Sequence, residues 1–170
     1  MGPGQGPMGG GPMMGNGPMG SRMGAAVPAA PTLGASSSAP LSPDAKAALL
    51  RALDEEYRAE SLYASIVSKV GARPPFQPIT RSERHHGWIL ESLATAHGLE
   101  LPTNPWAAAN QPEVANLAAG CRAGVESEKK TIAIYDELLK TDLPQDLRRA
   151  FDHLRAASAQ RHLPAFEACR

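Results

Sequence analysis

The sequence predicts an all-α fold, a four-helix bundle with one long crossover between its second and third helices. Three observations favour it. After residue 43, four segments place apolar residues at alternating steps of three and four, the spacing of helices that pack along one face. Each segment is bounded by helix start and stop signals. No segment shows the strict alternation and β-branched enrichment of a strand. The predicted bundle spans residues 42–170.

Residues 1–41 form a tail of different composition. Up to position 43 the chain holds 11 of its 16 Gly, 8 of its 16 Pro and all six Met, but no aromatic residue and a single charge, Arg22. Such a segment buries too little apolar surface to offset its ordering entropy, so we expect it to be disordered. The Met thioethers suit Cu(I), which leaves copper handling open as an alternative to a plain flexible tail.

The first helix is predicted from Pro43 to about Val70, because Ser42 offers an N-cap, Pro43 suits the first turn and Gly71 stops the helix. The second is predicted from Thr80 to near His97-Gly98. Thr80 and the Glu three residues later also match a capping box, which is an alternative role for that Glu.

The third helix is predicted from Pro112-Glu113 to about Lys140, and the fourth from Pro144 to the end of the chain. Pro164 falls inside the fourth helix. It frees the carbonyl of Gln160 and is expected to kink the helix there.

The connections predict the topology. The links 71–79 and 141–143 are short, so the first and second helices, and the third and fourth, are expected to form antiparallel hairpins. The link 98–111 has about 14 residues. It is long enough to run the length of the second helix, about 27 Å at 1.5 Å per residue. A four-helix bundle with one such crossover is the ferritin-like arrangement.

Polar residues interrupt the apolar stripe of every predicted helix. A carboxylate on a buried stripe must be paired, protonated or metal-bound, because burying a bare charge is prohibitive. No Lys or Arg lies on these stripes except, at one edge, Arg161. A bound cation therefore best explains why several carboxylates and imidazoles point into one core. The alternative is that the histidines are core residues with all their hydrogen bonds satisfied and no metal bound. The stripe residues are Glu56, Glu83, His86, Glu128 and His162.

The two halves of the bundle repeat. Glu56-x6-Tyr63 in the first helix matches Glu128-x6-Tyr135 in the third, and seven residues return to the same helical face. Both tyrosines are interpreted as core residues with buried hydroxyls rather than redox groups. The fourth helix matches Glu83-x2-His86 only in part: His162 corresponds to the histidine, but the position three residues before it is Ala159. A di-iron carboxylate bundle uses one Glu from each of two helices and a Glu-x2-His from each of the others.

The folded part resembles the ferritin-like superfamily and, more narrowly, its domain of unknown function 2202 family. The residues that carry the resemblance are Asp54-Glu55-Glu56 with Tyr63, Arg81-Ser82-Glu83-Arg84-His85-His86, Ala157-Ser158, His162-Leu163 and Ala165-Phe166. The resemblance implies metal ligands at Glu56, Glu83, His86, Glu128 and His162. The superfamily has a Glu at position 159, and related sequences often have one at 160, where this chain has Ala159 and Gln160.

Composition excludes several classes. With 17 basic and 17 acidic groups the net charge is zero, which argues against a nucleic-acid partner, and no stretch of about 18 apolar residues predicts a membrane span. The start of the chain lacks the pattern of a secretory signal. A cytoplasmic location is therefore the default expectation, and export is the expectation if the gene start lies upstream.

The two cysteines are expected to lie near each other. Cys121 is seven residues before Glu128 and Cys169 seven after His162, so in antiparallel helices both steps move the same way. If Glu128 and His162 face one another, the cysteines should too. Two small core residues are favoured over a disulfide.

The leading hypothesis is a metal-binding protein with iron-dependent redox or oxidase chemistry, and whether it is an enzyme stays open. Carboxylate and imidazole ligands favour iron or manganese over zinc. The alternatives are a helical interaction module with a degraded site and the copper-handling protein. Metal ions are the expected partners, and a second copy of this chain, in a homodimer, is a further candidate.

Overall fold

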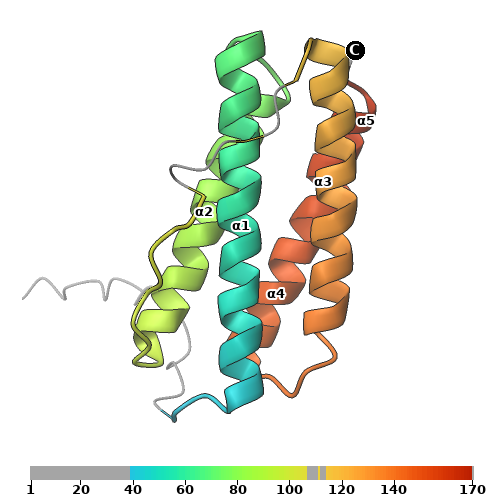
Figure 1. The fold of residues 1–170 in the computed structure, drawn as a ribbon. Coiled ribbons are helices and arrows are strands. Elements are labelled where there is room, and N and C mark those ends of the chain that lie inside the picture. The colour runs from blue at the N-terminus through green and yellow to red at the C-terminus, as the bar shows by residue number, and fades with distance from the viewer. Residues whose placement is uncertain (1–38, 107–110, 112–113, 170) are drawn as a thin grey trace, which may run out of the picture. The chain divides into compact units, whose positions relative to one another are not determined.

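The computed structural model describes residues 39–106, 111 and 114–169 (Figure 1), and the predicted tail lies almost wholly outside them. The described part is helical and contains no strand, which confirms the all-α class. None of its helices is both long and apolar enough to cross a membrane. The elements are α1 (Pro43–Val70), α2 (Phe76–Ala96), α3 (Leu117–Leu138), α4 (Gln145–Ala157), a π-helical turn (Ser158–His162) and α5 (Leu163–Glu167).

Within this part the helices pack side by side. Figure 1 shows α1 and α2 running in opposite directions, and α3 and α4 likewise, while α3 begins at the end of the bundle where α2 begins. Both α1 and α4 contact α2 and α3. Two described residues of the connection from α2 to α3 contact α1: Trp106 Nε1 donates to Asp54 Oδ1 at 2.8 Å, and Gln111 Nε2 donates to Ser61 Oγ at 3.1 Å.

The first helix has the predicted ends. Ser42 Oγ accepts a hydrogen bond from the Ala45 amide at 3.2 Å, and Pro43 occupies the first turn. Gly71, with φ of +88°, follows the last residue, Val70, in a conformation that favours glycine. Local capping chemistry is therefore enough to bound α1.

The predicted start of the second helix is wrong. The helix begins at Phe76, and Thr80 lies in its second turn, where its hydroxyl donates to the Phe76 carbonyl at 2.8 Å. Phe76 is fully buried, so its packing in the core stabilises the extra turn. Pro78 lies in the first turn of the helix, where a missing amide hydrogen costs no hydrogen bond. Thr80 is thus no N-cap, and the capping-box alternative for Glu83 fails.

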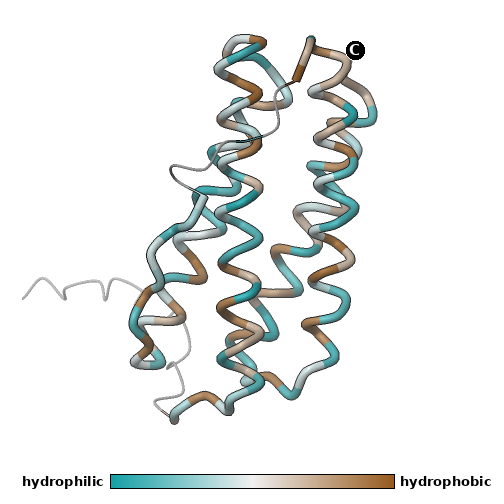
Figure 2. Tube along the Cα trace, viewed as in Figure 1, coloured by the Kyte–Doolittle hydropathy of each residue, from teal (hydrophilic) through white to brown (hydrophobic). Residues whose placement is uncertain are grey.

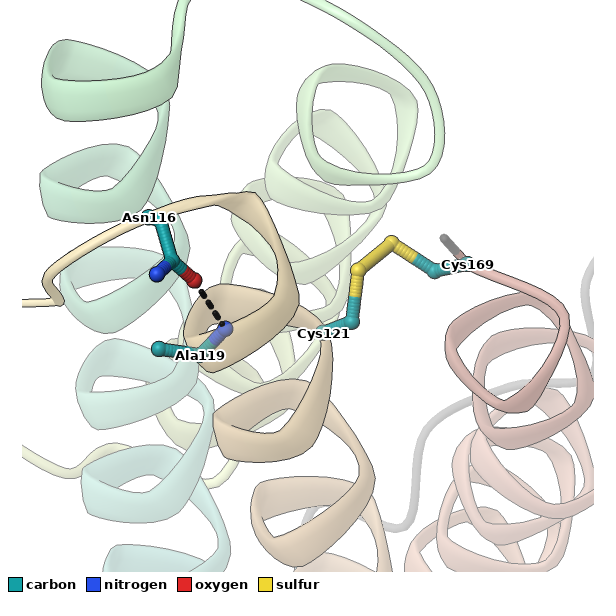
Figure 3. Close-up of a disulfide and its surroundings, with 4 residues drawn as sticks. All are labelled: Asn116, Ala119, Cys121 and Cys169. Carbon is teal, nitrogen blue, oxygen red and sulfur yellow. Dashed lines mark hydrogen bonds between the residues drawn. A yellow bond between two sulfur atoms is a disulfide. The ribbon is translucent and has the colours of Figure 1, made fainter.

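The third helix begins later than predicted. Pro112-Glu113 lie outside the described residues, but residues 114–116 are described and are not helical. The cap is Asn116, whose Oδ1 accepts from the Ala119 amide at 2.9 Å (Figure 3). At its other end α3 gives way to turns after Leu138, two residues before the predicted Lys140.

The fourth helical run is interrupted where Pro164 predicts. A π-helical turn separates α4 from α5, and Leu154, Ser158, His162 and Phe166 are all buried although they are spaced four apart. In a regular α-helix each four-residue step rotates a side chain by about 40° from the previous one. The wider π-turn removes this drift and keeps all four on the core side.

The core forms two apolar layers with the polar stripe residues between them along every helix. Figure 2 shows hydrophobic residues recurring between polar ones along the helices. One layer includes Leu49, Leu53, Leu90, Tyr135, Leu147, Phe151 and Leu154. The other includes Tyr63, Ile66, Phe76, Ile79, Cys121 and Phe166.

Candidate metal centre

The structure brings all five stripe residues together between the two apolar layers. Each is at least 96% buried. The α-helices supply four of them, and the π-turn supplies the fifth. They are Glu56 on α1, Glu83 and His86 on α2, Glu128 on α3 and His162 on the π-turn.

Glu83 lies at the middle of this cluster. Its Oε2 is 2.8 Å from His86 Nδ1, and its Oε1 is 2.9 Å from His162 Nδ1. One carboxylate thus faces two imidazoles, one from its own helix and one from the opposite hairpin. The Glu-x2-His spacing places the first pair on one helical face.

Two further carboxylates flank the imidazoles. Glu56 Oε2 is 3.3 Å from His86 Nδ1, and Glu128 Oε2 is 3.7 Å from His162 Nδ1. Two three-residue groups therefore share Glu83, and in each group one donor atom per residue lies within 4.8 Å of the others. The arrangement is close to two-fold symmetric.

Each flanking carboxylate is held by a tyrosine from the opposite helix. Tyr63 on α1 donates to Glu128 Oε1 at 2.7 Å, and Tyr135 on α3 donates to Glu56 Oε1 at 2.5 Å. Burial and the neighbouring carboxylates raise the pKa of both phenols well above the usual value, so both remain donors. The seven-residue Glu-to-Tyr spacing that occurs in both α1 and α3 thus allows the tyrosine of each helix to bond to the glutamate of the other. Each bond leaves Oε2 of its carboxylate turned toward an imidazole.

The side of the imidazoles away from the carboxylates meets one hydroxyl. Ser82 Oγ lies 3.2 Å from His86 Nε2 and 3.1 Å from His162 Nε2. The two rings stack, with centroids 5.5 Å apart and an interplanar angle of 19°. No role for the Ser82 hydroxyl is predicted from the sequence. The available signal was its position four residues before His86, on the same helical face.

Protons balance the charges of the cluster. Burial raises the pKa of Glu56 to about 8, and it also raises the pKa of Glu128. Burial acts the same way on Glu83, but hydrogen bonds from His162 and His86 outweigh it and lower that pKa to about 2. Burial opposes charging of the imidazoles, yet the adjacent carboxylates raise the pKa of His86 to about 10 and that of His162 to about 9. These shifts favour an ionised Glu83 between two protonated imidazoles in the metal-free cluster.

The donor set fits a cation. Among the described residues, Glu56 Oε2, Glu128 Oε2 and His162 Nδ1 are buried atoms without a well-aligned hydrogen bond, and all three point to the same cluster. Such atoms are costly unless something binds them. No Lys or Arg pairs with these carboxylates in the part of the chain that the structure describes, and Arg161 is exposed.

The fourth carboxylate of a symmetric site has no counterpart here. Ala159 is partly exposed, whereas the preceding Ser158 is 1% exposed and its hydroxyl has no hydrogen-bond partner among the described residues. The π-turn accounts for this shift, because it turns position 158 rather than 159 to the core. The centre therefore has three carboxylates and two imidazoles.

The two cysteines meet at the apolar layer that contains Cys121. Cys121 on α3 and Cys169 after α5 form a disulfide with Cα atoms 5.7 Å apart (Figure 3), which confirms their predicted proximity. The favoured expectation of two free core cysteines is wrong. Gly124 allows α3 and α5 to approach closely, since a Cβ at that position would lie 2.4 Å from the ring of Phe166 on α5. The pairing of Glu128 with His162, on which the cysteine prediction depended, also holds.

No protein-family model matches the chain, and no curated protein sequence matches it either. The function is therefore inferred from the geometry of the residues themselves.

Proposed function

We propose that residues 42–170 form a ferritin-like four-helix bundle that binds two divalent cations side by side. The observation that carries the proposal is the geometry of Glu83, whose two oxygens face two equivalent Glu–His pairs. In this proposal Glu83 would serve as a ligand in both ligand sets. Glu56 and His86 complete one ligand set, and Glu128 and His162 complete the other.

The topology supports the ferritin-like assignment. The two antiparallel hairpins are joined by one long connection, residues 97–116, so that α3 runs parallel to α2. Ferritin-like di-metal proteins combine this topology with a Glu from two helices and Glu-x2-His motifs on the others. This chain keeps five of those six residues, and the closer likeness to the domain of unknown function 2202 family is part of the proposal.

The donor atoms favour iron or manganese over zinc. Each ligand set has oxygen donors and one imidazole nitrogen but no sulfur, and bridging carboxylates suit octahedral ions better than tetrahedral zinc. Bound iron would supply redox chemistry, and oxidase activity is the reaction class that we propose for the iron-loaded protein. The apolar layers above and below exclude bulk water from the ligands.

The residues of the chain would manage charge when cations bind. His86 Nδ1 and His162 Nδ1 face Glu83 and hold protons in the metal-free protein, so these protons must leave before the nitrogens can act as ligands. Tyr63 and Tyr135 hold one oxygen of Glu128 and Glu56, which orients the other oxygen toward the ion.

Titration of chelator-stripped protein with Mn(II), and with Fe(II) under anaerobic conditions, tests the proposal. We expect two ions per chain for the unmodified protein, about one for Glu56→Gln and none for Glu83→Gln, because Glu83 serves both ligand sets. The matched control is Glu60→Gln. Glu60 lies on α1, as Glu56 does, but its carboxylate pairs with the exposed Arg84 at 2.7 Å. Absence of binding by the unmodified protein would favour the alternative of an interaction module with a degraded site.

A further inference from the structure

Ser82 differs from the other hydroxyl residues of α2. Thr80, Ser92 and Thr95 each donate to the carbonyl four residues earlier, at 2.8–2.9 Å. This is the usual way in which a helix satisfies such side chains. The hydrogen bonds of Ser82 within the described residues go instead to two imidazoles, those of His86 and His162. Its hydroxyl thus joins α2 to the π-turn across the bundle.

Counting hydrogens restricts how this contact works. A serine hydroxyl has one proton and two lone pairs, and a neutral imidazole has one N–H. If Ser82 donated to one ring, that ring would carry its hydrogen on Nδ1, the nitrogen that faces Glu83. A protonated Nδ1 cannot bind a cation. Both rings can use Nδ1 as a ligand only when both Nε2–H groups donate to the Ser82 oxygen. Ser82 is half-buried, which leaves its own proton free to meet solvent.

The shared acceptor also couples the two rings. Rotation of either imidazole about its Cβ–Cγ bond would exchange Nδ1 for a carbon or move Nε2 away from Ser82. Because one oxygen holds both rings in a stack with centroids 5.5 Å apart, an ion that orders one ring also orders the other. Hydrogen bonds of this kind on the outer nitrogen of a histidine ligand fix its tautomer and orientation.

We propose that Ser82 is the positioning residue that holds both His86 and His162 in the Nε2–H tautomer, so that the two ligand sets bind cations through Nδ1 and as a coupled pair. This inference rests on the proposed function. It adds a claim about which nitrogens bind and why the two ions depend on each other.

The test compares Ser82→Ala, which removes the acceptor, with Ser82→Thr, which keeps it, and with Ser92→Ala, a matched control on the same helix. Zn(II) serves as a diamagnetic probe. Calorimetric titration measures stoichiometry and affinity, and ¹⁵N NMR of histidine-labelled, zinc-loaded protein reports the tautomers. For unmodified protein and for Ser92→Ala we expect two ions and Nε2–H rings. For Ser82→Ala we expect at least one ion to bind about 10–100-fold more weakly, the usual effect of losing such a partner, and Ser82→Thr should restore binding.

The outcomes separate the two proposals. If the unmodified protein binds two ions and Ser82→Ala matches it in affinity and tautomer, the Ser82 inference is overturned and the proposed function stands. Nδ1–H rings in the zinc-loaded unmodified protein would overturn the inference even if Ser82→Ala fails to fold. If neither the unmodified protein nor any variant binds zinc, manganese or iron, the proposed function fails and the inference falls with it.

Discussion

Two adjacent residues of α1, Glu55 and Glu56, are both almost completely buried, but they face different partners. Glu55 contacts a guanidinium and one hydroxyl: Arg58 Nε donates to its Oε2 at 2.9 Å, and Thr131 Oγ1 donates to its Oε1 at 2.9 Å. Glu56 meets Tyr135 and the imidazole of His86. The first carboxylate is neutralised by a fixed guanidinium, and the second by protons that can be exchanged for another cation.

This difference shows which buried carboxylates indicate a binding site. Burial of a charge requires compensation, but it does not specify the compensating group. Around Glu55 the chain itself supplies the cation, and Arg58 also reaches Ser127 Oγ at 3.0 Å. Around Glu56 and Glu128 an oxygen of each carboxylate lacks a well-aligned partner among the described residues. An incomplete set of partners, rather than burial, therefore marks the candidate centre.

The largest expected effect separates the two clusters by stability. Glu55→Ala leaves the largely buried Arg58 without its partner, and breaking such a pair costs about 3–5 kcal/mol. Urea unfolding in the presence of chelator measures the loss. Addition of Mn(II) should still raise the melting temperature of this variant, because Glu55 belongs to neither ligand set. Loss of that response would show that the two clusters are not independent.

Cation binding should stabilise the native protein through the other cluster. Binding to the folded state alone adds about 2.7 kcal/mol at a hundredfold excess over Kd. Fe(II) or Mn(II) should therefore raise the melting temperature of the unmodified protein, and Glu128→Ala and His86→Ala should each abolish the increase. Thermal unfolding with and without metal provides the measurement. An unmodified protein that does not respond to near-millimolar metal would contradict the distinction between the clusters.

The metal-free protein should lose stability as the pH rises. The pKa values of His86 and His162, about 10 and 9, lie above the usual 6.5, and that of Glu56, about 8, lies above 4.5. From these three groups the folded state binds more protons than the unfolded state between about pH 4.5 and pH 10, so the stability that they contribute falls as the pH rises through this range. The fall is steepest between about pH 6.5 and 8, where all three groups contribute. Melting temperatures at pH 6.5, 8 and 9.5 in chelator should decrease by several degrees.

Two controls sharpen this pH test. Saturating Mn(II) should reduce the decrease, because the cation replaces the protons between the carboxylates. His153→Gln changes an exposed histidine and should leave the profile unaltered. A flat profile in the chelated, unmodified protein would mean that the imidazoles are neutral there.

The smallest effect is expected for Glu56→Gln in chelator. The amide keeps an oxygen that can accept from Tyr135 and removes a group whose ionised form is costly to bury, so the free energy of unfolding should change by no more than about 1 kcal/mol. Its neighbour variant Glu55→Gln should cost more, since Arg58 loses an ionised partner. Equal losses for the two variants, measured by urea unfolding, would remove the contrast between them.

Local chemistry in the sequence determined much of the bundle. The cap at Ser42 and the glycine at 71 bound α1 as predicted, and the three-and-four spacing placed five polar residues on buried stripes that do converge. The seven-residue steps from Glu128 and His162 also predicted that Cys121 and Cys169 meet. These inferences succeed because capping and helical periodicity depend on near neighbours in the chain.

Only the tertiary structure decided the rest, because it depends on groups far apart in the sequence. Burial of Phe76 extends α2 by a turn that Thr80 did not predict. Glu55 is contacted by α3 and by a basic residue of α1 itself, whereas Glu56 is contacted by the imidazole of His86 on α2. The contact of Ser82 with His162 spans 80 residues and two hairpins. Periodicity identifies which residues face the core, but the side chains that meet there are selected by the packing of helices against one another.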